Sequence, residues 1–214
     1  MIQDSLQSIY RKLPSGVTLV AVSKFHPVSA IQEAYDAGQR VFAESRPQEL
    51  SAKVPLLPKD IEWHFIGHLQ TNKLKMVLPF VTLVQSVDSL HLLEAIQAWA
   101  EANHRDIDVL LELHLGAEET KQGFSAEEIL AIVSSPRTGV RIRGLMGMAT
   151  NTEDVRVIEK DFERIEALFK RIQGMGVPGF DQLSIGMSGD WPVAVRHGAT
   201  MVRIGTDIFG PREY

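Results

Sequence analysis

The chain of 214 residues contains no cysteine. Disulfide bonds, thiolate nucleophiles and cysteine-ligated metal ions are therefore excluded. No apolar run approaches the roughly 20 residues that a membrane helix needs. The first five residues lack a basic start followed by an apolar stretch. We therefore expect no secretory signal and predict a cytoplasmic protein.

A strong charge of either sign is also missing, because 22 basic residues stand against 27 acidic ones and the net charge is −5. This balance offers no general attraction for nucleic acid or for an anionic membrane. Hydrophobic residues make up 44% of the chain, which is enough for a sizeable core. The sequence shows no linker, low-complexity tract or repeat, so we predict a single domain over residues 1–214.

Strand-like runs alternate with helix-like runs along the whole chain. The strand-like runs cover residues 17–24, 40–45, 62–67, 81–87, 107–115, 141–148, 182–188 and 201–206. The clearest helix covers residues 154–173, where Ile158, Phe162, Ile165 and Phe169 recur every three or four positions. Other predicted helices cover residues 29–38, 46–54, 70–78, 89–103 and 190–198, and Ser125 with Glu128 predicts a capping box.

Eight strands joined by helical crossovers predict an α/β protein with a single (β/α)8 TIM barrel. A short helix over residues 2–13 precedes the first strand, so the barrel should carry an extra N-terminal helix. An open doubly wound sheet is the alternative. The nucleotide fingerprint G-x-G-x-x-G is absent after the first strand, which disfavours that alternative.

The first predicted strand, residues 17–24, is aliphatic on both faces and ends on Lys24. Reactive groups of such barrels lie at the carboxyl ends of the strands. A lysine there is partly shielded from water, and an amine that can lose its proton can attack an aldehyde. The alternative is an ordinary lysine that leaves the strand for solvent.

Glycine and small hydroxyl side chains stand at the ends of the last two predicted strands. The seventh strand ends with Gly186 and Ser188, and the eighth ends with Gly205 and Thr206. Loops at these places commonly bind phosphate in TIM barrels, although the same residues also make ordinary turns. In a closed barrel the eighth strand lies beside the first, so these loops should neighbour Lys24.

Arg203 alternates with Val202 and Ile204, which predicts that its side chain points into the barrel. A buried arginine needs a partner. The partner is either a carboxylate such as Glu44 or Glu112, or a ring nitrogen of a bound aromatic cofactor. A lysine, a phosphate loop and a partner for a ring nitrogen together meet the needs of pyridoxal 5′-phosphate (PLP).

The sequence resembles the YggS/PROSC-type family of PLP-binding (PLP homeostasis) proteins, which is similar to the barrel domain of alanine racemase and lacks the second domain. The matching stretches are residues 19–24, 63–67, 69–73, 143–146, 183–190 and 201–210. They follow the order of the family over the whole chain. Two stretches depart from its usual pattern: Ala43 and Ser45 replace glycine and asparagine around Glu44, and His68 replaces proline.

The resemblance implies roles for five residues. Lys24 would hold the cofactor as a Schiff base, an internal aldimine. Ser188, Gly205 and Thr206 would contact its phosphate, and Arg203 would face its pyridine nitrogen. We do not expect Ser45 to replace the missing asparagine as a cofactor contact.

Arg203 is a donor only, so a pyridine nitrogen facing it stays unprotonated and the ring is a poor electron sink. A racemase also needs a second acid or base, and none of the tyrosines, Tyr10, Tyr35 and Tyr214, is well placed in the sequence. We therefore predict a protein that buffers or delivers PLP, with little or no catalysis and no catalytic residue. A small PLP-dependent amino-acid racemase is the alternative, and a barrel enzyme that uses Lys24 on sugar phosphates ranks third.

The expected partners are PLP and PLP-dependent apo-enzymes, with no nucleic acid or membrane, and we expect a monomer. No metal site is expected, because His64 and His68 fall on a strand end and its loop and not on one helix face. His64 is predicted to be a hydrogen-bonded core histidine. Glu112 and His114 are predicted to form a polar pair inside the barrel, with a proton relay as the alternative. Met146 and Met148 are predicted to fill the barrel interior.

Overall fold

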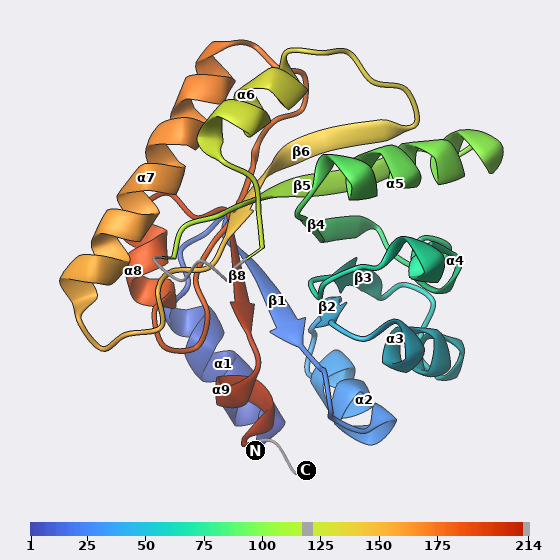
Figure 1. Cartoon of the computed structure of the whole chain (residues 1–214). Helices are drawn as coiled ribbons and strands as arrows, with labels where there is room; N and C mark the ends of the chain where they lie inside the picture. Colours follow the sequence, from blue (N-terminus) through green and yellow to red (C-terminus); the bar gives the residue numbers. More distant parts are fainter. Residues whose placement is uncertain (117–121, 212–214) are drawn as a thin grey trace.

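The computed structural model describes residues 1–116 and 122–211, and its strands close into one parallel barrel in sequence order (Figure 1). The strands are β1 (Thr18–Val22), β2 (Val41–Glu44), β3 (Glu62–Phe65), β4 (Leu83–Val87), β5 (Ile107–Leu113), β6 (Val140–Gly147), β7 (Gln182–Ser184) and β8 (Met201–Ile204). The closing pair is β1 with β8, in which Val20 lies opposite Arg203. The predicted (β/α)8 TIM barrel is therefore confirmed, and the open doubly wound sheet is wrong.

Helices surround this barrel on its outer side (Figure 1). They are α1 (Ile2–Lys12), α2 (Val28–Asp36), α3 (Pro47–Lys53), α4 (Leu74–Val77), α5 (Leu90–Ala102), α6 (Ala126–Val133), α7 (Val155–Gly174), α8 (Trp191–Arg196) and α9 (Thr206–Phe209), with short 3-10 turns η1 (Val54–Leu56) and η2 (Thr71–Lys73). The extra N-terminal helix α1 packs against α2 and α9. Within residues 1–116 and 122–211, no helix combines the length and the apolar character required to cross a bilayer.

The core has two parts, which follow from the alternation of side chains along each strand. Leu19 and Ala21 of β1 pack in the large core between the barrel and its helices. Val20 and Val22, on the opposite face of the strand, belong to a smaller cluster with Leu110 and residues of other strands inside the barrel. A polar group inside the barrel is thus enclosed by apolar side chains and needs a partner there.

The apolar periodicity and the capping residues in the sequence predict most of the helices correctly. The predicted stripe of α7 is buried at every position named above, and the capping box at Ser125 and Glu128 is formed. The helix α7 ends at Gly174, one residue beyond the predicted range. The predicted helix over residues 70–78 is divided into η2 and α4. The helix α9 was not predicted, because four residues are too few to show a helical period.

Several predicted strands extend too far at their carboxyl ends. Lys24 lies two residues beyond β1, β7 ends at Ser184 and β8 ends at Ile204. After β7 the backbone turns at Gly186, whose φ of 93° lies in the left-handed region. The predicted site residues Lys24, Ser188, Gly205 and Thr206 are therefore in the loops that follow the strands or at the start of α9.

Candidate functional site

A pocket of about 250 Å³ opens at the carboxyl ends of the strands. All five residues predicted for the site line it, and they come from segments far apart in the chain. They are Lys24, Ser188, Arg203, Gly205 and Thr206. The remaining lining residues are Val22, His26, Ile66, Met146, Met148, Met187 and Gly189. The structure thus brings the predicted amine, guanidinium and hydroxyl groups together at one place.

Lys24 reaches this pocket from the loop that follows β1, and it is half-buried. The loop is tightly turned: the His26 N–H donates to the Ser23 carbonyl oxygen at 3.1 Å, and Phe25 has a φ of 68°. A bulky residue rarely adopts this left-handed conformation. The ring of His26 stacks on Phe209 of α9 at 4.9 Å, so the loop is also joined to the segment that follows β8.

Arg203 points into the barrel, as predicted, and only 4% of it is exposed. Its guanidinium donates to the carbonyl and hydroxyl oxygens of Ser184, both at 2.7 Å, and to the Gly147 carbonyl oxygen at 3.0 Å. Burial lowers the pKa of Arg203 to about 10, against the opposite influence of Glu112 and Asp190. The guanidinium is therefore protonated at neutral pH.

The carboxylates considered as partners of Arg203 lie elsewhere. Glu44 is paired with Lys53 at 2.8 Å, so an ion pair between Arg203 and Glu44 is wrong. Glu112 acts on Arg203 through its charge, without a direct ion pair between these two described residues. Burial raises the pKa of Glu112 to about 7, and the nearby charge of Asp88 adds to this rise.

A chain of hydrogen bonds continues from Arg203 across the inside of the barrel. The Ser184 hydroxyl donates to Gln85 Oε1 at 2.6 Å, and Gln85 Nε2 donates to His64 Nδ1 at 2.9 Å. Burial lowers the pKa of His64 to about 4, so its ring is neutral. His64 is thus the hydrogen-bonded core histidine that the sequence predicted. The orientation of Arg203 is set by this chain of residues from β8, β7, β4 and β3.

The loops after β7 and β8 form the opposite wall of the pocket. The hydroxyl-bearing Ser188 is half-buried and Thr206 is exposed, so both are accessible from the pocket. A Cβ on Gly205 would lie 3.1 Å from the Val22 carbonyl oxygen, which leaves little room for a side chain beside β1. A Cβ on Gly186 would lie 2.6 Å from the Cβ of Ala194, so glycine lets α8 pack closely behind the loop.

Some residues of the pocket escaped the sequence analysis. His26 lines it but belonged to no recognised pattern, and Met187 belonged to a stretch that matches the family but was given no role. Met146 is buried as predicted, whereas Met148 is 37% exposed and lies at the pocket, so its placement in the barrel interior is wrong. The alternation of Met146, Gly147 and Met148 placed both methionines on one face and could have indicated their shared pocket.

Other predicted groups lie apart from the pocket. Glu112 interacts electrostatically with Asp88, Arg203 and His68, and among the described residues no hydrogen bond or ion pair joins it to His114, the partner that the sequence predicted. His68 bonds to Asp88 at 2.8 Å. Residues 1–116 and 122–211 contain no group of three acidic or histidine side chains that could hold a metal ion.

The tyrosines considered as a second acid or base are engaged elsewhere. Tyr10 donates to Gln39, and Tyr35 donates to Asp60 at 2.7 Å. Tyr214 lies outside the described residues. Neither described tyrosine lines the pocket.

The donor set suits a small phosphorylated aromatic aldehyde. It offers an amine, a buried guanidinium and two hydroxyl groups, around a cavity smaller than the roughly 300–1,000 Å³ typical of drug-sized ligands. Gly205 brings the backbone of the loop after β8 close to Val22, which also lines the pocket, at a position where a side chain has little room. PLP, which combines an aldehyde, a ring nitrogen and a phosphate, fits these residues.

Comparison with known proteins places the chain in the same class. The model of the alanine racemase N-terminal domain matches residues 1–213. The chain is 36% identical over 210 residues to the pyridoxal phosphate homeostasis protein of Vibrio alginolyticus, covering 95% of this chain and 90% of the relative. It is 38% identical over 212 residues to that of Escherichia coli strain K12, covering 94% of this chain and 88% of the relative. The chain therefore belongs to the family of pyridoxal phosphate homeostasis proteins, which share the alanine racemase N-terminal domain.

A solved structure shows the same architecture. PipY of Synechococcus elongatus, determined with PLP bound, matches with a TM-score of 0.88 and 36% identity over 98% of this chain and 100% of PipY. Its structure without PLP matches with a TM-score of 0.93 and 37% identity over the same shares. The likeness therefore extends over nearly the whole chain.

Proposed function

We propose that this protein binds PLP in the pocket at the carboxyl face and acts in PLP homeostasis by storing or delivering the cofactor. The observation that carries the proposal is the convergence of Lys24, Arg203 and the loops after β7 and β8 on one cavity. The names of the relatives and the PLP bound by PipY support the same ligand.

The proposed attachment is a Schiff base. The Lys24 amine adds to the aldehyde carbon, and one water leaves as the C=N bond forms, so no electron donor or acceptor is needed. We assign Ser188, Gly205 and Thr206 to the phosphate, because hydroxyl and backbone N–H groups donate to anions without adding charge. Arg203 is assigned to the ring nitrogen. Its protonated guanidinium can only donate, which keeps that nitrogen unprotonated.

The same geometry supports binding over catalysis. PLP bound at this site supplies an electrophilic aldehyde and a ring that can accept electrons. An arginine beside the ring nitrogen weakens that second property, and Tyr10 and Tyr35 bond outside the pocket. We therefore propose little or no turnover, with PLP-dependent apo-enzymes as recipients and a monomer as the working form.

The test compares the wild type with Lys24→Ala and with Lys59→Ala, an exposed lysine outside the pocket. After incubation with PLP and borohydride reduction, mass spectrometry should find one stable adduct on wild type and on Lys59→Ala, mapped to the peptide that contains Lys24. The Lys24→Ala protein should carry none. An adduct spread over several surface lysines, or equal labelling of all three proteins, contradicts the assignment.

The absence of useful catalysis is tested separately. The PLP-loaded protein is incubated with L- and D-amino acids carrying deuterium at the α-carbon. We expect no loss of label above the rate produced by free PLP. Multiple turnovers with any one amino acid would support the racemase alternative.

A further inference from the structure

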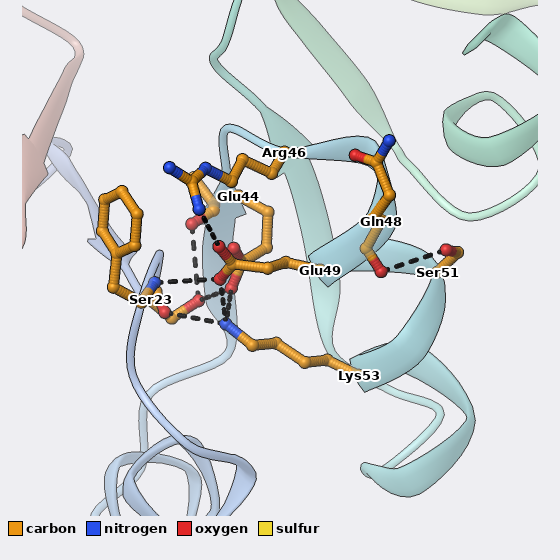
Figure 2. A network of polar contacts seen from close by, with 9 residues as sticks. Ser23, Glu44, Arg46, Gln48, Glu49, Ser51 and Lys53 are labelled. Atoms are coloured by element: carbon orange, nitrogen blue, oxygen red, sulfur yellow. Dashed lines mark hydrogen bonds and ion pairs between the residues drawn. The ribbon is translucent and has the colours of Figure 1, made fainter. Parts of the chain in front are cut away.

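A cluster of charged side chains lies behind the loop that carries Lys24 (Figure 2). It joins Lys53 of α3 to Glu44 at the end of β2 and to Glu49 on the preceding turn of α3. Lys53 is 8% exposed and Glu44 is fully buried. None of these three residues lines the pocket, so the cluster is outside the proposed cofactor contacts.

The ammonium group of Lys53 has three protons and three acceptors. Lys53 Nζ donates to Glu44 Oε1 at 2.8 Å, to Glu49 Oε2 at 2.9 Å and to the Ser23 carbonyl oxygen at 3.0 Å. The third bond is the informative one, because two carboxylates alone already compensate the buried charge. It ties the cluster to the residue directly before Lys24.

The residue directly after Lys24 is tied to the same cluster. The Phe25 N–H donates to Glu49 Oε2 at 2.9 Å, and the Ser23 hydroxyl donates to Glu44 Oε1 at 2.7 Å (Figure 2). The guanidinium of Arg46 lies over the Phe25 ring at 4.3 Å. These contacts hold Phe25 in its left-handed backbone conformation, which a bulky residue does not adopt without support.

The two carboxylates of the cluster are opposed by Lys53 and by Arg46, which lies 3.7 Å from Glu49. Burial raises the pKa of Glu44, and the charge and hydrogen bond of Lys53 work against that rise. Burial also acts to raise the pKa of Glu49, but hydrogen bonds from Lys53 and the Phe25 N–H outweigh it and lower the pKa. Glu44 Oε2 is buried without a hydrogen-bond partner, so the cluster tolerates no further loss of a donor.

We propose that Lys53, Glu44 and Glu49 are positioning residues for Lys24. They fix the peptide units on both sides of Lys24, so that its amine is presented to the pocket in one orientation and the Schiff base forms quickly and completely. This inference rests on the proposed attachment of PLP to Lys24. A positioning role differs from a purely stabilising one in what it predicts. A change in the cluster should alter the attachment of PLP, and this effect should disappear when Lys24 is absent.

The test uses Glu49→Gln, which keeps the shape of the side chain but weakens its bonds to Lys53 and to the Phe25 N–H. Asp161→Asn is the matched control: Asp161 is 7% exposed and holds another loop through bonds from the Thr150 N–H and hydroxyl at 2.8 and 2.7 Å. Attachment of PLP is followed by stopped-flow absorbance and by borohydride trapping. Thermal unfolding is measured in parallel.

We expect Glu49→Gln to slow attachment by roughly ten- to a hundredfold, the size of effect produced when a reacting group is misplaced. The Asp161→Asn protein should attach PLP at nearly the wild-type rate even if it unfolds earlier. In the Lys24→Ala background, Glu49→Gln should leave the affinity for non-covalent PLP unchanged, because the coupling acts only through Lys24.

Two results overturn the inference. One is a Glu49→Gln protein that is folded and attaches PLP at the wild-type rate. The other is an equal loss of PLP affinity with and without Lys24, which shows a general change of the pocket. If Glu49→Gln does not fold, Glu44→Gln gives the same comparison, because its neutral side chain keeps an acceptor for Lys53 and removes a buried charge. A wild-type protein that forms no adduct refutes the proposed function itself, which separates the two failures.

Discussion

Replacing Arg203 by methionine tests the polar chain inside the barrel. Methionine keeps an unbranched apolar side chain but leaves the two Ser184 oxygens and the Gly147 carbonyl oxygen without their donor. A hydrogen bond from a charged donor contributes about 1.5–3 kcal/mol. Removal of the guanidinium also removes the cost of burying it, so we expect a net loss of about 2–4 kcal/mol in the free energy of unfolding.

The assay is urea unfolding at neutral pH without PLP, followed by circular dichroism. With a slope of about 3 kcal/mol per molar urea, the midpoint should fall by roughly 1 M. Arg143→Met is the control, because Arg143 is 29% exposed and its ion pairs with Asp108 and Asp181 lie near the surface. Its loss should stay near about 1 kcal/mol or below. An equal loss of unfolding free energy in the two variants would refute the idea that the buried hydrogen bonds of Arg203 stabilise the barrel more than a surface ion pair does.

Two further predictions concern packing and pH. Gly186→Ala should lower the free energy of unfolding by about 1–3 kcal/mol, because the new Cβ would lie 2.6 Å from Ala194 Cβ and the φ of 93° disfavours alanine. Gly174→Ala is the control and should cause no such loss, because no atom lies within 4 Å of its Cβ position. Thermal unfolding of the two variants makes the comparison. Because the pKa of Glu112 rises from 4.5 to about 7 on folding, the folded state binds more protons in that interval and stability falls as pH rises through it. Glu112→Gln should therefore match the wild type below pH 4.5 and exceed it above pH 7 by on the order of 3 kcal/mol, and a wild-type advantage at pH 8 would contradict this.

The order of the elements was readable from the sequence because aliphatic runs and helical stripes alternate without interruption. The site followed from the same reasoning: a closed barrel places the loop after its first strand beside those after the last two. That proximity alone predicts that Lys24, Gly205 and Thr206 lie together. The carboxyl ends of the strands were less predictable, because apolar residues continue beyond the last residue that is hydrogen-bonded in the sheet.

The partners of the buried charges could not be predicted in the same way. The sequence offered carboxylates for Arg203, but the structure uses Ser184 and Gly147, and Ser184 is bonded to Gln85, which is 99 positions away. Lys53 follows Glu49 by four residues, a spacing typical of an exposed helix pair. Only the fold shows that this pair turns inward. Polar contacts between distant segments carry no periodic signal in one sequence.

The chain of hydrogen bonds from Arg203 to His64 limits which residues could replace Arg203 in a redesign of this barrel. A carboxylate at position 203 would stabilise a protonated ring nitrogen and so a better electron sink, but it would accept where Arg203 donates. The Ser184 hydroxyl, now bonded to Gln85, would have to turn toward the new carboxylate. Gln85 would then have to reverse its amide, and His64 would have to move its proton to Nδ1. A different reactivity at the carboxyl face therefore requires simultaneous changes in hydrogen bonding on four strands, β8, β7, β4 and β3.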